Sequence, residues 1–225
     1  MKRILQVFLV AAAMPVFAQT PTDGLMMPAK SFCTGFMYTK DQWHEYWEGS
    51  LKRDNLNIGT LTTQSLMYYG VYGVSSKLNV MASVPYVWTN ASMGTLAGQR
   101  GIQDLMLAAK YNVLKAEGAT GKFKVFAVGS FSTPLTNYTV DFFPLSIGFG
   151  STTVAGRLTG NYLATKGWYA NASAGYTWRS NVTLDRPSYF TDGQYFSTNE
   201  VQMPNAIDYV VSFGYNINAF RAELF

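Results

Sequence analysis

The stretch Leu78–Trp88, LNVMASVPYVW, shows the pattern that decides the fold of this protein. Its even positions, from Leu78 to Trp88, are all apolar or aromatic, while its odd positions include the polar residues Asn79 and Ser83. This alternation with a period of two is typical of a β-strand that has one apolar face. The stretch is about twice as long as common soluble strands of about 5–6 residues. It has the length of a tilted strand that crosses a bilayer, about 9–11 residues.

The same alternation recurs along the chain and predicts a sheet of long strands. Clear cases follow Leu78–Trp88 at Asp104–Val113, Thr153–Tyr162, Trp168–Arg179 and Asp208–Asn216. Three further segments alternate less clearly and leave their facing open: Ser31–Thr39, Gly59–Gly73 and Lys122–Thr133. We therefore predict an all-β fold, a transmembrane antiparallel up-and-down β-barrel with at least eight strands that occupies residues 19–225.

The predicted connections alternate between short and long. The short turns are Val74–Lys77, Lys115–Gly121, Ala164–Gly167 and Asn216–Ala219. The long, polar loops are Lys40–Ile58, Thr89–Arg100, Pro134–Gly150 and Ser180–Asn205. Short turns at one end and long loops at the other are the organisation of an outer-membrane barrel.

The composition excludes several classes of protein. Only 13% of the 225 residues are charged, against about 25% in an average soluble domain, while 48% are hydrophobic and 16% aromatic. A disordered chain would have far fewer apolar residues. The mean hydropathy of +0.01 is too low for a bundle of membrane helices. A single cysteine, Cys33, excludes a disulfide scaffold.

The N-terminus has the three regions of a secretory signal peptide. A basic start at Lys2 and Arg3 precedes the apolar run Ile4–Phe17, and small residues at Val16 and Ala18 suit cleavage before Gln19. A buried N-terminal helix is the alternative. Removal of residues 1–18 lowers the formal net charge from +4 to +2, so we expect no nucleic-acid partner. The predicted location is the outer membrane, with its lipid as a partner.

Aromatic residues gather near both ends of the predicted strands. Those near long loops are Tyr86, Trp88, Tyr176 and Trp178, and those near short turns are Tyr72, Tyr111, Tyr162 and Trp168. Two such belts match the two interfaces of a bilayer. General enrichment of aromatic residues in strands is the alternative explanation.

Five charged residues lie within strands, all on the face opposite the apolar one. They are the predicted lumen-facing residues Asp104, Lys110, Arg157, Arg179 and Asp208. Lysine or arginine facing the middle of a bilayer would cost about 2–4 kcal/mol, so this distribution favours a polar interior. A network of these charges across the interior would either determine which molecules pass or stabilise the barrel without affecting passage.

The first long loop carries the predicted rim residues Trp43, His44 and Trp47. The two tryptophans form either an aromatic ligand-binding rim or a loop that packs on itself. A catalytic reading would pair His44 with a serine such as Ser50, but no GxSxG motif accompanies it. One histidine and one cysteine cannot supply a dedicated zinc site. We predict no enzyme activity, no cofactor and no metal.

The C-terminus suggests missing strands. A ninth strand would start at Ala219, and the seven residues to Phe225 are too few for a bilayer crossing. The face of Phe225 would also carry Arg221 and Glu223. We therefore expect a chain truncated at its C-terminus.

Several segments together resemble a known family. Gly70–Val80, GVYGVSSKLNV, followed by Val84–Val87, VPYV, is similar to a hairpin of bacterial outer-membrane barrels related to the MetA pathway of phenol degradation. Gly101–Leu105, GIQDL, resembles the strand that follows. Gln42–Gly49 and Asn57–Gln64 resemble the Bacteroidetes branch of that group. The resemblance implies an outer-membrane barrel that passes small, apolar or aromatic molecules.

The sequence thus predicts a channel or transporter for the passive passage of small molecules, with the substrate itself unidentified. Two alternatives stay open. One is a structural or adhesion barrel with a plugged lumen, and the other is a lipid-modifying barrel enzyme.

Overall fold

The computed structural model describes residues 19–142, 144–191, 193–217 and 220–224. The predicted signal peptide, residues 1–18, lies outside these residues. The described chain is built from β-strands, and the prediction of an all-β fold is confirmed. Within this part of the chain, no helix is long and apolar enough to cross a membrane.

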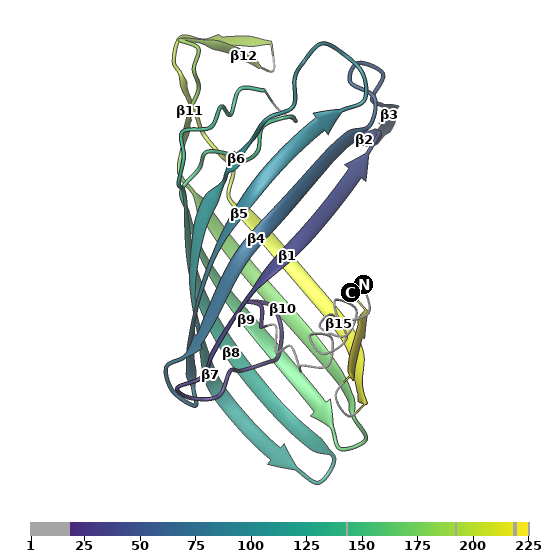
Figure 1. The fold of residues 1–225 in the computed structure, drawn as a ribbon, viewed down its shortest axis with the longest axis vertical. Coiled ribbons are helices and arrows are strands. Elements are labelled where there is room, and N and C mark those ends of the chain that lie inside the picture. The colour runs from purple at the N-terminus through teal and green to yellow at the C-terminus, as the bar shows by residue number, and fades with distance from the viewer. Residues whose placement is uncertain (1–18, 143, 192, 218–219, 225) are drawn as a thin grey trace, which may run out of the picture.

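One curled antiparallel sheet forms the body of the molecule (Figure 1). Each long strand pairs with the next long strand along the chain, as an up-and-down topology requires. In hydrogen-bonded order the strands are β1 (Phe32–Trp43), β4 (Leu61–Gly73), β5 (Leu78–Ala91), β7 (Asp104–Gly118), β8 (Gly121–Pro134), β9 (Thr153–Ala164), β10 (Trp168–Arg179), β15 (Ala206–Ile217) and β16 (Phe220–Leu224). The short strand β6 (Arg100–Ile102) pairs with β5.

The sheet curls so strongly that β1, β4 and β5 cross in front of β9, β10 and β15 in Figure 1. Among the described residues β1 and β16 are the two ends of the hydrogen-bonded order, so the sheet has the shape of a half-barrel. Right-handed strand twist accumulates across many long strands and produces this curl.

Long loops and short turns lie at opposite ends of the sheet, as predicted. The described residues of the long loops form small strand pairs: β2 (Glu45–Glu48) with β3 (Leu51–Asp54), β11 (Val182–Thr183) with β14 (Glu200–Val201), and β12 (Tyr189–Thr191) with β13 (Gln194–Phe196). The predicted short turn at Lys115–Gly121 is shorter than its predicted bounds, because β7 and β8 stay paired as far as Gly118 and Gly121. A register shift between Asn112 and Leu114 accommodates an extra residue in β7.

The two faces of the sheet differ sharply in chemistry. In β5, Asn79, Met81 and Ser83 are buried, while Val80 and Ala82 are exposed. The buried face is the inner face, around which the sheet curls, because one short N-terminal segment contacts it from several strands at once. The outer face is almost wholly apolar, whereas the inner face combines polar side chains with a cluster of apolar ones, so the exposed apolar face is the reverse of a soluble sheet packed on its core.

The structure settles the facing of the three segments with weak alternation. In β4, Tyr68 and Tyr72 are exposed on the outer face and Val71 is buried on the inner face. In β1, Phe32, Phe36 and Tyr38 project outward. In β8, Phe123 and Phe131 project outward, but Phe126 and Val128 are buried on the inner face. Apolar residues on both faces explain why the alternation in this stretch was indistinct.

Candidate functional site

The N-terminal segment Gln19–Lys30 lies on the inner face of the half-barrel and forms the centre of the candidate site. The amide of Asn79 on β5 donates to Gln19 Oε1 at 2.7 Å, and the backbone N–H of Met27 donates to the same oxygen at 3.2 Å. Met27 packs in a cluster with Val71, Met81, Ala108 and Val128, and Cys33 lies against it. The cluster members come from β4, β5, β7 and β8, so one segment covers four strands.

Lys110 on β7 holds this segment by charge. Its side chain is 0% exposed. The ammonium Nζ lies 2.8 Å from Asp23 Oδ1, 2.5 Å from the carbonyl oxygen of Asp23 and 3.2 Å from that of Thr20. It also lies 4.9 Å from the centroid of the Phe126 ring. A buried charge requires such partners, because an isolated ammonium is costly to desolvate.

A glycine permits the close approach of the segment. Gly24 is buried, and a Cβ at this position would clash with the side chain of Asn161 on β9. The segment therefore reaches from the wall of β5 and β7 across to β9.

A polar track covers the opposite wall, formed by β9, β10, β15 and β16. Arg157 forms an ion pair with Asp208 and donates to Ser173 Oγ at 2.9 Å. Further along the same strands, Asn171 donates to Ser212 Oγ at 3.0 Å and to Glu223 Oε1 at 3.1 Å. These hydrogen bonds cross strands and align the inner-face side chains into one continuous polar surface.

A loop closes over the inner face at the long-loop end. Leu145 and Ile147 are buried, and Thr89 Oγ1 on β5 donates to the carbonyl oxygen of Leu145 at 2.6 Å. Tyr138 holds the same loop in place by two hydrogen bonds. Its hydroxyl donates to Asp104 Oδ1 at 2.6 Å and accepts from the backbone N–H of Gly150 at 3.0 Å. Burial, and then the hydrogen bond to Asp104, raise the pKa of the Tyr138 phenol above its ordinary value.

All five predicted lumen residues lie on the inner face, but they divide into separate groups. Arg157 and Asp208 pair with each other, whereas Lys110 pairs with Asp23 and Asp104 with Tyr138. The fifth, Arg179, donates to the carbonyl oxygen of Pro204 at 3.4 Å and lies over the ring of Phe149. The contacts of the described residues therefore do not form the single network that the sequence suggested.

Sequence reasoning missed Asp23, Gln19 and Tyr138. The segment that follows the signal peptide has no strand pattern, and Tyr138 lies in a long loop. Acidic and amide residues in an otherwise unexplained segment were the only signal that pointed to an interior role.

The rim residues of the first long loop lie at the hairpin of β2 and β3. Trp43 packs edge-on against Tyr46, with ring centroids 6.3 Å apart, while Trp47 is 67% exposed. The His44 imidazole lies 4.0 Å from Glu45. A hydrogen bond from Lys52 lowers the pKa of the exposed Glu45 carboxyl. In the described hydrogen bonds, His44 and Ser50 are not brought together.

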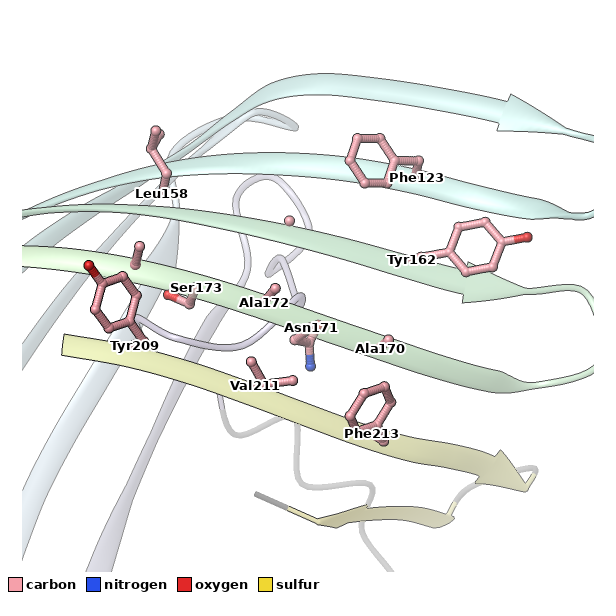
Figure 2. Close-up of a pocket in the computed structure, with 12 residues that line it drawn as sticks. Phe123, Leu158, Tyr162, Ala170, Asn171, Ala172, Ser173, Tyr209, Val211 and Phe213 are labelled. Atoms are coloured by element: carbon pink, nitrogen blue, oxygen red, sulfur yellow. The ribbon is translucent and has the colours of Figure 1, made fainter.

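The outer face has a different character. A groove of about 650 Å³ runs over β8, β9, β10 and β15. Figure 2 shows large side chains on both sides of the small residues Ala170 and Ala172: Phe123 and Tyr162 on one side, Tyr209 and Phe213 on the other. Most of its lining residues are apolar; Asn171 and Ser173 also line it, although their side chains form hydrogen bonds in the polar track.

A curled, up-and-down antiparallel sheet, apolar outside and polar inside, places this protein in the class of β-barrel proteins. The family described as "Putative MetA-pathway of phenol degradation" matches residues 53–224, which is most of the chain. The chain belongs to this family, as its resemblance predicted. A comparison with curated proteins finds no match.

Proposed function

We propose that this protein is an outer-membrane β-barrel, exported by a signal peptide at residues 1–18, that passes small apolar or aromatic molecules through its interior. The proposal treats it as a passive channel or transporter and assigns it no catalytic role and no cofactor.

The observation that carries the proposal is the exposure of the apolar face. Leu158 on β9, and Tyr209 and Phe213 on β15, which lie on either side of β10, are 62%, 75% and 61% exposed. In water a continuous apolar surface of this extent would be an association or aggregation site. In a bilayer it is the surface that lipid covers, and the groove in Figure 2 suits acyl chains.

The aromatic belts support the same placement. Two aromatic pairs lie near the long-loop end. The ring centroids of Tyr86 and Trp88 are 6.0 Å apart, and those of Tyr176 and Trp178 are 4.6 Å apart. Tyr162 and Trp168 pair at the short-turn end, 5.3 Å apart. These rings lie on or beside the apolar face, at the two levels where bilayer interfaces favour tyrosine and tryptophan.

The interior supports passage. The polar track offers hydroxyl, amide and charged groups along one wall, while segment Gln19–Lys30 occupies the other. In this proposal the segment narrows the path and restricts it to small molecules. A structural barrel with a plugged lumen is the second candidate, because the same segment fills part of the interior.

A paired substitution tests the membrane placement. Leu158→Arg on the outer face of β9 should lower the free energy of unfolding in lipid bilayers by about 2–4 kcal/mol. The matched control is Leu56→Arg in the first long loop, where the side chain is 80% exposed, and its effect should stay within about 0.5 kcal/mol. Equal, small effects at both positions would contradict a lipid-facing sheet.

Single-channel conductance distinguishes a channel from a structural barrel with a plugged lumen. The full-length protein, checked by heat-modifiable gel migration, should give discrete current steps in a planar bilayer. A folded barrel without conductance would favour the plugged, structural role.

A further inference from the structure

A cavity of about 220 Å³ lies between the start of the N-terminal segment and the inner wall formed by β1, β4, β5 and β7. The segment contributes Gln19, Thr20 and Pro21 to the lining. The wall contributes four methionines, one from each of the four strands: Met37, Met67, Met81 and Met106. Tyr69 and Ser83 add two hydroxyl groups.

The strand register explains why the methionines gather. Met37 and Met67 are direct partners across β1 and β4, and Met106 is the direct partner of Ser83 across β7 and β5. Directly opposed side chains of antiparallel strands have Cβ atoms about 4.5–5.5 Å apart. The thioethers are therefore brought together by backbone pairing of four strands, not by one flexible loop.

The lining favours an uncharged ligand. None of the described residues that line the cavity is charged, so an ion that entered would lose its hydration without gaining a charged partner. A cavity of about 150 Å³ with an apolar lining is known to hold benzene. The larger volume here suits a single ring with a small substituent.

Methionine adds a preference for aromatic rings. Its thioether is polarisable and flexible, and contact with a ring strengthens binding by about two- to tenfold. The four side chains can adapt to rings with different substituents. The hydroxyls of Tyr69 and Ser83 provide polar contacts for a small substituent.

We propose that this methionine-lined cavity is a binding site for small, uncharged, one-ring aromatic molecules. The inference deepens the proposed function and rests on it, because the cavity is lined by side chains of the inner face, along which molecules would pass.

Ligand binding is coupled to the seating of the N-terminal segment. Gln19 lines the cavity and also bonds to Asn79, and the carbonyl oxygen of Thr20 accepts from Lys110. A ligand that contacts Gln19 and Thr20 stabilises the segment in its seated position. Ligand binding should therefore slow thiol labelling of Cys33, which packs against the Met27 cluster beneath the segment.

The test uses full-length protein in detergent micelles with ¹³C-labelled methionine methyl groups. Toluene should shift the methyl resonances of Met67 and Met106 through its ring current, and should leave those of Met93 and Met203 in place, since these two lie outside the cavity. Methylcyclohexane, of similar size but without an aromatic ring, should bind at least about twofold more weakly. Benzoate, which is charged, should produce no shift.

Substitutions in the lining test whether toluene binds in the cavity. Ser83→Leu fills it and should weaken toluene binding at least tenfold, while Ser130→Leu, on the inner face of β8 and away from the cavity, should keep normal affinity. If Ser83→Leu does not fold, Met106→Leu, which keeps the volume but removes the sulfur, should weaken binding about twofold or more.

The outcomes separate this inference from the proposed function. Conductance in a planar bilayer without any toluene-dependent shift would overturn the binding site and leave the channel standing. Toluene-dependent shifts confined to Met67, Met106 and their neighbours would support the site even in a barrel that does not conduct. Equal binding of toluene and methylcyclohexane, or shifts at Met93 as large as those at Met67, would also overturn it.

Discussion

The buried ion pair between Lys110 and Asp23 provides the most direct test of how the N-terminal segment is held. In Asp23→Ala the ammonium of Lys110 stays buried and loses the Asp23 carboxylate, while the carbonyl acceptors of Thr20 and residue 23 remain. Removing one partner of a buried pair costs about 3–5 kcal/mol. Because two acceptors remain, we take the lower value, about 3 kcal/mol, for the loss of seating free energy.

This loss of free energy increases the population of molecules in which the N-terminal segment is detached from the inner face. Each 1.4 kcal/mol corresponds to a factor of ten, so about 3 kcal/mol raises the open population about a hundredfold. Cys33 is the single cysteine of the chain and packs against the cluster that contains Met27. When opening is fast relative to labelling, the rate of thiol modification follows the open population.

The assay is the rate at which a maleimide modifies Cys33 in the folded barrel. We expect about a hundredfold faster labelling in Asp23→Ala. The double variant Asp23→Ala with Lys110→Met removes both charges and should label more slowly than Asp23→Ala alone, because no ammonium is left buried without the Asp23 carboxylate. Part of the acceleration should remain, because that carboxylate also accepts from the backbone N–H of Leu25 at 2.8 Å.

A matched surface change controls for general effects. Glu45→Ala breaks an exposed ion pair with Lys52 at the distant β2–β3 hairpin and should leave Cys33 labelling unchanged. An unchanged rate in Asp23→Ala, with heat-modifiable migration intact, would refute the idea that this pair holds the segment. An equal acceleration in the double variant would show that lost charge pairing is not the cause.

Further predictions concern other groups of the interior and the backbone at Lys30. Arg157→Ala, which breaks the pair with Asp208, should change single-channel conductance and ion selectivity; unaltered permeation with normal folding would place the pair outside the path. Tyr138→Phe removes the hydroxyl that joins Asp104 to Gly150 and should destabilise this loop by about 1–3 kcal/mol, seen as faster amide hydrogen exchange around residue 138. The pKa of Tyr138 is raised in the folded loop. The hydrogen bonds of its hydroxyl should therefore stabilise the loop fully below the ordinary pKa of 10.0 and less as the pH rises beyond it. The same exchange experiment at increasing pH checks this. Lys30 has a positive φ of 60°, so Lys30→Val should lower the free energy of unfolding in urea by about 1–2 kcal/mol while Lys30→Gly does not; equal effects would mean that the backbone here relaxes.

The sequence determined the strands that alternate cleanly. In Leu78–Trp88 and Trp168–Arg179 the side-chain period of two is a local property of an extended backbone, so the apolar and polar faces follow from the order of residues. The same logic placed Asp104, Lys110, Arg157, Arg179 and Asp208 opposite the apolar side chains, where the structure has them. The alternation of short turns and long loops followed from the spacing of these strands.

Only the tertiary structure decided which partner each of those charges meets. Lys110 and Asp23 are 87 positions apart, and Arg157 and Asp208 are 51 apart. Such contacts depend on sheet curvature, strand register and the path of a segment without periodicity. The four methionines likewise look like scattered packing residues in the sequence, and the pairing of β1, β4, β5 and β7 unites them. Periodicity reports the face on which a side chain lies, whereas its neighbours on that face depend on how distant strands are joined.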